Sequence, residues 1–191
     1  TDASQDWYVF HRSVGSSQML KLNSSGAAVS NDGLQAVSGT MFHSDKFYPT
    51  STANTSSATY VAYIFAHDAQ DFGTDSDEAI IKCGSYTGNV TSGSSTQHID
   101  LGFEPQFFLV KISSLSGQEW FLVDTMRGFV NNSNDSNDLR LMPSTADSEY
   151  GYQVGHPTAT GIQLNGNENE TNKNGETYIY MAIRRPHKPA E

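Results

Sequence analysis

The clearest strand signal is a nearly continuous apolar run near the end of the chain, at residues 177–184. Successive side chains of a β-strand point to opposite faces, so this run has two largely apolar faces, one with Ile179, Met181 and Ile183 and the other with Tyr178, Tyr180 and Ala182. Such a pattern is typical of a strand that is covered on both sides. Residues 60–66 are apolar throughout, so we predict a second strand of the same kind there.

Shorter apolar runs between turn-forming residues predict further strands. They span residues 7–10, 19–22, 46–48, 79–83, 98–101, 106–112, 120–124, 139–142 and 161–164. Turn clusters such as Asn31-Asp32-Gly33 and Asn165-Gly166-Asn167 separate these runs. Seven candidate strands fall within the roughly 105 residues 79–184, a spacing that suits a small antiparallel sandwich. The sequence therefore predicts an all-β fold, an antiparallel β-sandwich of the jelly-roll type.

Two stretches of the chain resemble one another. Residues 6–10, Asp-Trp-Tyr-Val-Phe, recur as Glu-Trp-Phe-Leu-Val at 119–123, and each Trp is followed at the same distance by a glycine, Gly15 or Gly128. The later matches are Leu20-Lys21-Leu22 with Leu139-Arg140-Leu141, and Thr59-Tyr60-Val61 with Thr177-Tyr178-Ile179. The alternative is a chance alignment of short apolar runs. We interpret the order of matches as two tandem related units.

The second copy has a strand before its Trp, at 106–112, for which the first copy has no room. We therefore expect residues 1–67 to be the C-terminal part of a first, N-terminally incomplete sandwich unit. Residues 68–78 are predicted to be an acidic linker, 79–186 a complete second unit and 187–191 a tail. The copies differ in length mainly at 129–138, which we predict to be a surface loop. The rival arrangement is one sandwich built from both copies about a pseudo-twofold axis.

Charge and composition narrow the classes of function. The formal net charge of -10 argues against a nucleic-acid partner, because an acidic surface repels phosphate. With Cys83 as the only cysteine, neither an intrachain disulfide nor a cysteine-based zinc site can form. No apolar run approaches the roughly 20 residues that span a bilayer, so no membrane contact is predicted.

Candidate chemistry is sparse. The sequence has no Gly-x-Ser-x-Gly elbow, no His-Glu-x-x-His and no phosphate-binding glycine loop, and its histidines are scattered. Paired carboxylates of the Glu-x-Asp-x-Glu kind are absent as well. Residues 71–78 and 131–138 are acidic enough to be weighed as calcium loops, but neither has the EF-hand register. We therefore predict no catalytic residue, no cofactor and no bound metal.

Aromatic residues are the remaining candidates for ligand contact. Trp7 and Trp120 could stack on sugars, but their shared place in the repeat favours packing, so we predict that both anchor a core. Four tyrosines in or near predicted loops are better candidates for exposed contacts: Tyr48, Tyr86, Tyr150 and Tyr152.

Four stretches of the chain together resemble a known family. They are residues 82–89, with Tyr86-Thr87-Gly88; 101–111, with Gly102-Phe103-Glu104-Pro105; 120–128, with Asp124-Thr125-Met126-Arg127-Gly128; and 176–186, with Tyr178-Ile179-Tyr180. The succession resembles a repeated domain in tail-fibre and other virion structural proteins of marine tailed phages. The first copy departs from the pattern, with His11-Arg12-Ser13-Val14-Gly15 where Asp-x-x-Arg-Gly is expected.

The resemblance implies a virion-exposed, extracellular, lectin-like β-sandwich without catalysis, in a tail fibre, a spike or a capsid-attached appendage. Its implied partners are other virion proteins, further copies of the chain in a homo-oligomer, and a host-surface glycan. No site residue is carried over from the family. The alternatives are a carbohydrate-binding module of a bacterial secreted protein and a depolymerase.

Overall fold

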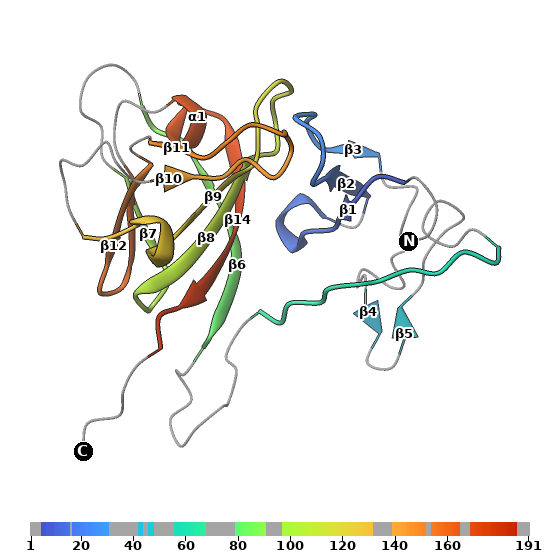
Figure 1. Ribbon diagram of the computed structural model, residues 1–191, viewed down its shortest axis with the longest axis horizontal. Helices are drawn as coiled ribbons and strands as arrows, with labels where there is room; N and C mark the ends of the chain where they lie inside the picture. The colour runs from blue at the N-terminus through green and yellow to red at the C-terminus, as the bar shows by residue number, and fades with distance from the viewer. Residues whose placement is uncertain are drawn as a thin grey trace.

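The protein is described here from a computed structural model (Figure 1). The structure describes residues 5–15, 17–30, 42–43, 46–47, 56–67, 79–90, 97–131, 139–151, 154–164 and 169–186. Within these residues, no helix has the length and apolar character needed to cross a membrane.

Two antiparallel sheets form the centre of the molecule (Figure 1). The four-stranded sheet has the order β6 (Ile81–Thr87), β14 (Thr177–Arg184), β8 (Pro105–Ile112) and β9 (Phe121–Asp124). The three-stranded sheet has the order β12 (Gly155–Thr158), β13 (Gly161–Leu164) and β7 (Gln97–Asp100). All these pairings are antiparallel, which confirms the predicted all-β sandwich.

One apolar core fills the space between the two sheets. From the four-stranded sheet it takes Phe108, Val110, Ile112, Phe121, Val123, Tyr178, Tyr180 and Ala182, and from the three-stranded sheet Ile99, Ile162 and Leu164. The side chains of Tyr178, Tyr180 and Ala182 thus share the inner face, as their alternation predicts, while Ile179 belongs to a second cluster on the outer face. The central strand β14 is therefore covered on both sides.

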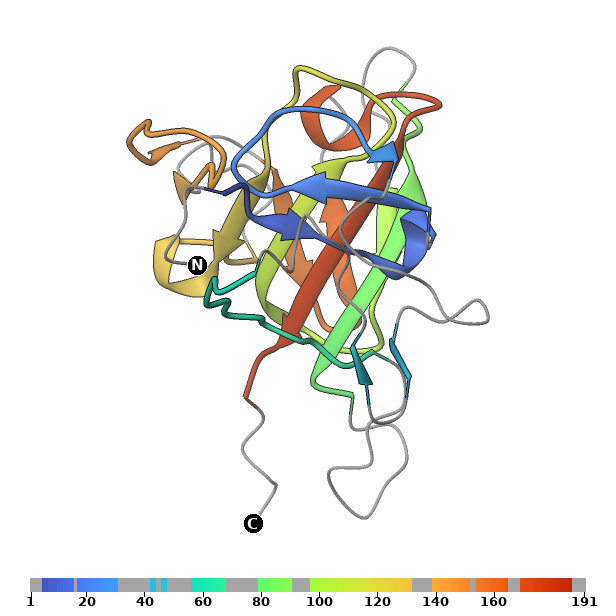
Figure 2. The same cartoon turned by 90° about the vertical axis from the view of Figure 1, so that its right-hand side faces the viewer.

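A third layer covers part of this outer face. The strands β1 (Tyr8–Val9), β2 (Gln18–Lys21) and β3 (Val29–Ser30) form a small antiparallel sheet, with the 3-10 helix η1 (Arg12–Val14) between β1 and β2. Figure 2 shows these strands crossing over the four-stranded sheet. Leu20 of this layer packs against Trp120 and Ile179. We call residues 5–30 the N-terminal layer.

Hydrogen bonds fix the N-terminal layer to the sheet. The Trp120 indole Nε1 donates to the Lys21 carbonyl (2.9 Å), and the Ala28 amide donates to the Ser113 carbonyl (2.9 Å). The Ser25 carbonyl accepts from the Gly117 amide (2.9 Å) and from the ammonium of Lys111 (3.5 Å), a lysine that is fully buried. The layer is therefore held by polar contacts as well as by apolar packing.

This arrangement bears on the predicted domain organisation. Both sheets of the sandwich come from residues 81–184, so the described residues do not form the rival arrangement in which both copies share one sandwich. The duplication into two sandwich units is not confirmed, and the boundaries at 67, 78 and 186 remain predictions. In the described part of the chain, the first copy contributes a layer on the second.

Smaller elements complete the fold. The hairpin-like pair β10 (Leu139–Arg140) and β11 (Tyr150–Gly151) lies beside β9, and the 3-10 helix η3 (Thr125–Arg127) follows β9 directly. The short helix α1 (Asn169–Asn172) precedes β14, and β4 (Phe42–His43) pairs with β5 (Lys46–Phe47). The strands β3, β4, β11 and β12 and the short helices were not predicted from the sequence.

Three sequence predictions are wrong. Residues 60–66 are not assigned to a strand, and most of their large side chains are exposed, so an apolar composition alone did not place them in a sheet. Trp7 is 54% exposed and so is not a core anchor. Phe129, placed in a surface loop, is fully buried in the sandwich core. The acidic stretch 71–78, residues 132–138, Tyr48 and Tyr152 lie outside the described residues.

Candidate functional site

The stretches that carry the family resemblance lie together in one sheet. Residues 82–89 run along β6, 101–111 along β8, 120–128 along β9 and η3, and 176–186 along β14. In the sheet order β6-β14-β8-β9 these strands are consecutive neighbours. The resemblance therefore falls on a single folding unit, and its most polar part, the turn after β9, is the candidate site.

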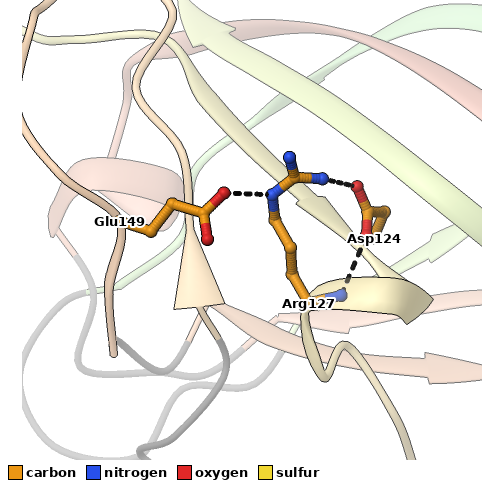
Figure 3. A network of polar contacts seen from close by, with 3 residues as sticks. All are labelled: Asp124, Arg127 and Glu149. Atoms are coloured by element: carbon orange, nitrogen blue, oxygen red, sulfur yellow. Dashed lines mark hydrogen bonds and ion pairs between the residues drawn. The ribbon is translucent and has the colours of Figure 1, made fainter.

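The Asp-x-x-Arg-Gly pattern forms a capped turn (Figure 3). The Asp124 carboxylate accepts a hydrogen bond from the Arg127 amide (3.0 Å), which satisfies a donor at the start of η3. Gly128 ends the 3-10 helix at φ 94°, a left-handed conformation that favours glycine. The next amide, that of Phe129, donates to the Asp124 carbonyl (3.0 Å), and the Phe129 side chain enters the core. Each residue of the pattern therefore has a local structural role.

Charge ties this turn to a neighbouring loop. The Arg127 guanidinium bonds the Asp124 carboxylate on one side and, through Nε, the Glu149 carboxylate on the other (2.6 Å), as Figure 3 shows. The hydrogen bond that Arg127 donates to the Glu149 carboxylate is the largest cause that raises the pKa of Arg127, so the guanidinium keeps its charge at any ordinary pH. Met126, which lies between Asp124 and Arg127 in the sequence and belongs to η3, has a side chain that is 92% exposed. The network holds a rigid turn with an apolar tip.

A buried arginine lies on the adjacent β10 strand. The guanidinium of Arg140 lies between the rings of Phe121 and Tyr150, at 4.5 and 4.4 Å from their centroids, and it bonds the Glu170 carboxylate and the Tyr150 hydroxyl. This arrangement reverses the usual pattern, because Leu139 is exposed while Arg140 is buried. Arg140 and Glu149 were not predicted from the sequence as parts of a site. The only sequence signal, and only for Arg140, is the alternation of Leu139, Arg140 and Leu141.

The predicted ligand-contact tyrosines lie in different surroundings. Tyr150 on β11 is partly exposed and packs on Arg140. Tyr86 on β6 is half-buried, with its ring stacked on that of Tyr178 at 4.8 Å between centroids and its hydroxyl donating to the Thr171 carbonyl (2.6 Å). Burial raises the pKa of Tyr86 well above its usual value. These contacts favour a packing role for Tyr86, whereas Tyr150 keeps a surface available to a ligand.

The first copy has a turn of similar design. His11 caps η1 through Nδ1, which accepts from the Ser13 amide (3.2 Å), and Gly15 ends the helix at φ 81°. The His11 Nε2 donates to the Tyr180 carbonyl (3.0 Å), so these partners select the neutral tautomer with the proton on Nε2. Burial is the main cause that lowers the pKa of His11. In this copy the capping side chain also fixes the turn to β14.

Side chains that commonly bind metals are dispersed in the part of the chain that the structure describes. There, no three or more side chains of His, Cys, Asp or Glu gather closely enough to hold an ion. Burial raises the pKa of the half-buried Cys83 thiol, which disfavours the reactive thiolate form.

An open hollow of about 320 Å³ lies between the N-terminal layer and the end of the four-stranded sheet. Two of the hydroxyl groups that line it are engaged within the protein, since Ser113 donates to the Thr177 carbonyl (3.1 Å) and Ser114 to the Glu176 carboxylate (2.6 Å). Ser13, Gln18 and Thr177 also line the hollow, so its wall is largely polar.

Comparison with known proteins gives one result. No curated protein and no solved structure matches the chain. A family model matches residues 1–186, from before the N-terminal layer to the end of β14. The chain therefore belongs to the family described as Domain of unknown function (DUF7483).

Proposed function

We propose that this protein is a phage virion structural domain, used in a tail fibre, a spike or a capsid-attached appendage for assembly or for attachment to the host surface. The observation that carries the proposal is that four separate stretches resemble the virion domain, and that these stretches are the four neighbouring strands of one sheet. Matches scattered by chance would not be expected to fall on every strand of one sheet.

The chemistry of the turn after β9 also supports this proposal. Asp124, Arg127 and Gly128 are used for capping, ion pairing and a left-handed backbone, and together they stiffen a turn that exposes Met126. These contacts are structural, as a module that keeps one shape in an assembled particle would require.

Proteomic analysis of purified phage particles tests the proposal directly. The parent protein is expected in intact particles after nuclease treatment and density-gradient banding, at a copy number fixed relative to the major capsid protein. Labelling of particles with an antibody against this chain then distinguishes a tail position from a capsid position. Absence of the parent protein from intact particles would overturn the proposal.

A carbohydrate-binding module is the second candidate, favoured by the partly exposed Tyr150 beside the charged Arg140. An aromatic ring that is partly open to solvent can stack on a sugar. Glycan-array binding that is lost in Tyr150→Ala and kept in Met126→Ala would support this candidate. An array without signal for the wild-type chain would contradict it.

The proposal includes an expectation that the domain does not catalyse a reaction. Incubation of the chain with polysaccharide from a host surface should leave the polymer length unchanged. A shortened polymer, measured by size-exclusion chromatography, would favour the depolymerase alternative.

A further inference from the structure

Residues 61–65 form the most exposed apolar run in the described part of the chain. Val61 is 64% exposed, Tyr63 72%, Ile64 67% and Phe65 45%. The backbone of residues 58–67 is not assigned to any helix or strand, and no strand pairing among the described residues includes 61–65. Large apolar side chains gathered in this way on a surface mark an interaction site.

Charge restricts what this run can meet. The chain carries a formal net charge of -10, yet no Asp, Glu, Lys or Arg occurs between Ser56 and Ala66. Two copies of an acidic chain repel each other over most of their surface. An uncharged apolar strip is a place where two copies can meet without bringing carboxylates together.

The order of side chains suits self-pairing. Antiparallel pairing of residues 61–65 with the same residues of a second copy, centred on Tyr63, places Val61 opposite Phe65 of the partner subunit and Tyr63 opposite Tyr63 of the partner subunit. Aromatic pairs and pairs of an aromatic with a β-branched residue are the favourable cross-strand combinations. A twofold axis through Tyr63 gives both copies the same contact, which is the commonest oligomer symmetry.

We infer that residues 61–65 are a dimerisation strand, which pairs antiparallel with the same strand of a second copy of this chain. The inference is independent of whether the protein is part of a virion. At these exposures, the four large side chains offer on the order of 400–500 Å² per copy, since a fully exposed aromatic side chain contributes about 150–250 Å². Two copies therefore bury at most about 800–1,000 Å², below the roughly 1,200 Å² at which stable specific interfaces begin, so the dimer is weak and reversible.

Sedimentation equilibrium of the 191-residue chain tests the contact. The wild-type chain should shift from monomer to dimer as its concentration rises from about 1 to 200 µM, a range suited to a weak interface. Tyr63→Asp should abolish the shift, because it places two carboxylates against each other at the centre of the pair. The matched control is Met126→Asp, at an apolar side chain on η3 that is even more exposed than Tyr63, which should leave the shift unchanged.

Each contrary result overturns the inference. A wild-type chain that stays monomeric across this range rules out the dimer, and flotation of a monomeric chain with neutral lipid vesicles would assign the apolar run to a membrane instead. A dimer that persists in Tyr63→Asp places the contact elsewhere on the chain. Circular dichroism of each variant should match the wild type, because the substituted side chains are exposed.

Disulfide trapping tests the register. In a Cys83→Ser background, Tyr63→Cys should give an interchain disulfide under mild oxidation, because opposed residues of antiparallel strands have Cα atoms about 4.5–5.5 Å apart, within the range that a disulfide can span. Val61→Cys is the matched control. Its two copies lie about four residues apart along the paired strands, roughly 13 Å, and should not cross-link. Equal cross-linking at both positions, or none at 63, would overturn this pairing.

Discussion

Two turn units of this molecule share a local design but differ in burial. The unit at residues 7–22 and the unit at 120–141 each contain a strand, a 3-10 helix with a side-chain cap, a glycine with positive φ and a returning antiparallel segment. Trp120 is only 2% exposed, whereas Trp7, at the same place in its unit, is 54% exposed.

The difference shows what a repeated sequence pattern determines. Capping residues and glycines act through the backbone within a few residues, so both units fold in the same way locally. Burial depends on what packs against a unit. The second unit belongs to the sandwich and is then covered by the N-terminal layer. The first unit is part of that layer, and its Trp7 is not a member of the shared cluster of Leu20, Trp120 and Ile179.

Substitution of the paired tryptophans gives the largest expected difference. Trp120→Ala should lower the free energy of unfolding by about 3–5 kcal/mol, because it opens a cavity under the N-terminal layer and removes the hydrogen bond to the Lys21 carbonyl. Trp7→Ala should cost less than about 1 kcal/mol. Urea denaturation followed by circular dichroism measures both values. Equal decreases in the free energy of unfolding would mean that the two tryptophans are equally buried.

The buried Lys111 gives the next effect. Burial lowers its pKa to about 8 from 10.5, so between these values the unfolded chain binds more protons than the folded chain. The free energy of unfolding should therefore rise with pH, by about 1–2 kcal/mol from about pH 8 to 9.5. Lys111→Met removes the titrating group and should remove this rise. An identical rise in the variant would show that Lys111 is not the cause.

That experiment also sharpens the comparison of the two units. The Lys111 ammonium donates to the carbonyls of Ile112 (2.8 Å) and Ser25 (3.5 Å), so it joins the sheet to the N-terminal layer. Measurements should stay below about pH 10, since unfolded tyrosines titrate there. Burial raises the pKa of Tyr178 and Tyr180 to about 12, which makes stability fall with pH in that higher range.

Much of the fold could be predicted from the sequence, because alternation records which face of a strand is buried. The two faces of β14 and the apolar runs of β8 and β9 were predicted in this way. Residues 60–66 show where composition misleads: their composition matches that of β14, but they are not assigned to a strand, because β-propensity depends on the packing that surrounds a segment. The strand β12, with Pro157 and two flanking polar residues, gives too little alternation to predict.

The candidate site was less predictable, because its contacts join residues distant in sequence. The pattern Asp124 to Gly128 was found, but its ion pair with Glu149 depends on a loop placed by the β10–β11 pairing. Arg140 is buried through contacts with Phe121, Tyr150 and Glu170, none of them near it in a short sequence window. The stacking of Tyr86 on Tyr178 likewise requires the register of β6 and β14.

The capping residue Asp124 gives a smaller effect than the buried groups. Asp124→Ala removes both the acceptor for the Arg127 amide and the ion pair, and should cost about 1 kcal/mol of folding free energy. Asp124→Asn keeps a capping oxygen and should lower the folding free energy by only about a few tenths of a kcal/mol, since partly exposed ion pairs contribute little. Thermal denaturation of both variants measures the difference. If Asp124→Asn lowers the stability as much as Asp124→Ala does, the ion pair rather than the cap stabilises the turn.

The equivalent cap in the first unit should respond to pH. His11 is neutral in the fold, with its pKa lowered from 6.5 mainly by burial, because protonation would place a second donor against the Ser13 amide. Its contribution is therefore complete above pH 6.5 and is lost as the pH falls through the lower pKa of the folded state. Urea denaturation at pH 7 and about pH 5.5 should show this loss in the wild type and a smaller one in His11→Asn. His98→Asn, at an exposed histidine, is the control and should retain the wild-type loss. A loss that is equal in all three proteins would show that His11 does not cause it, and the contrast between the histidine cap and the aspartate cap would then lie only in their contacts.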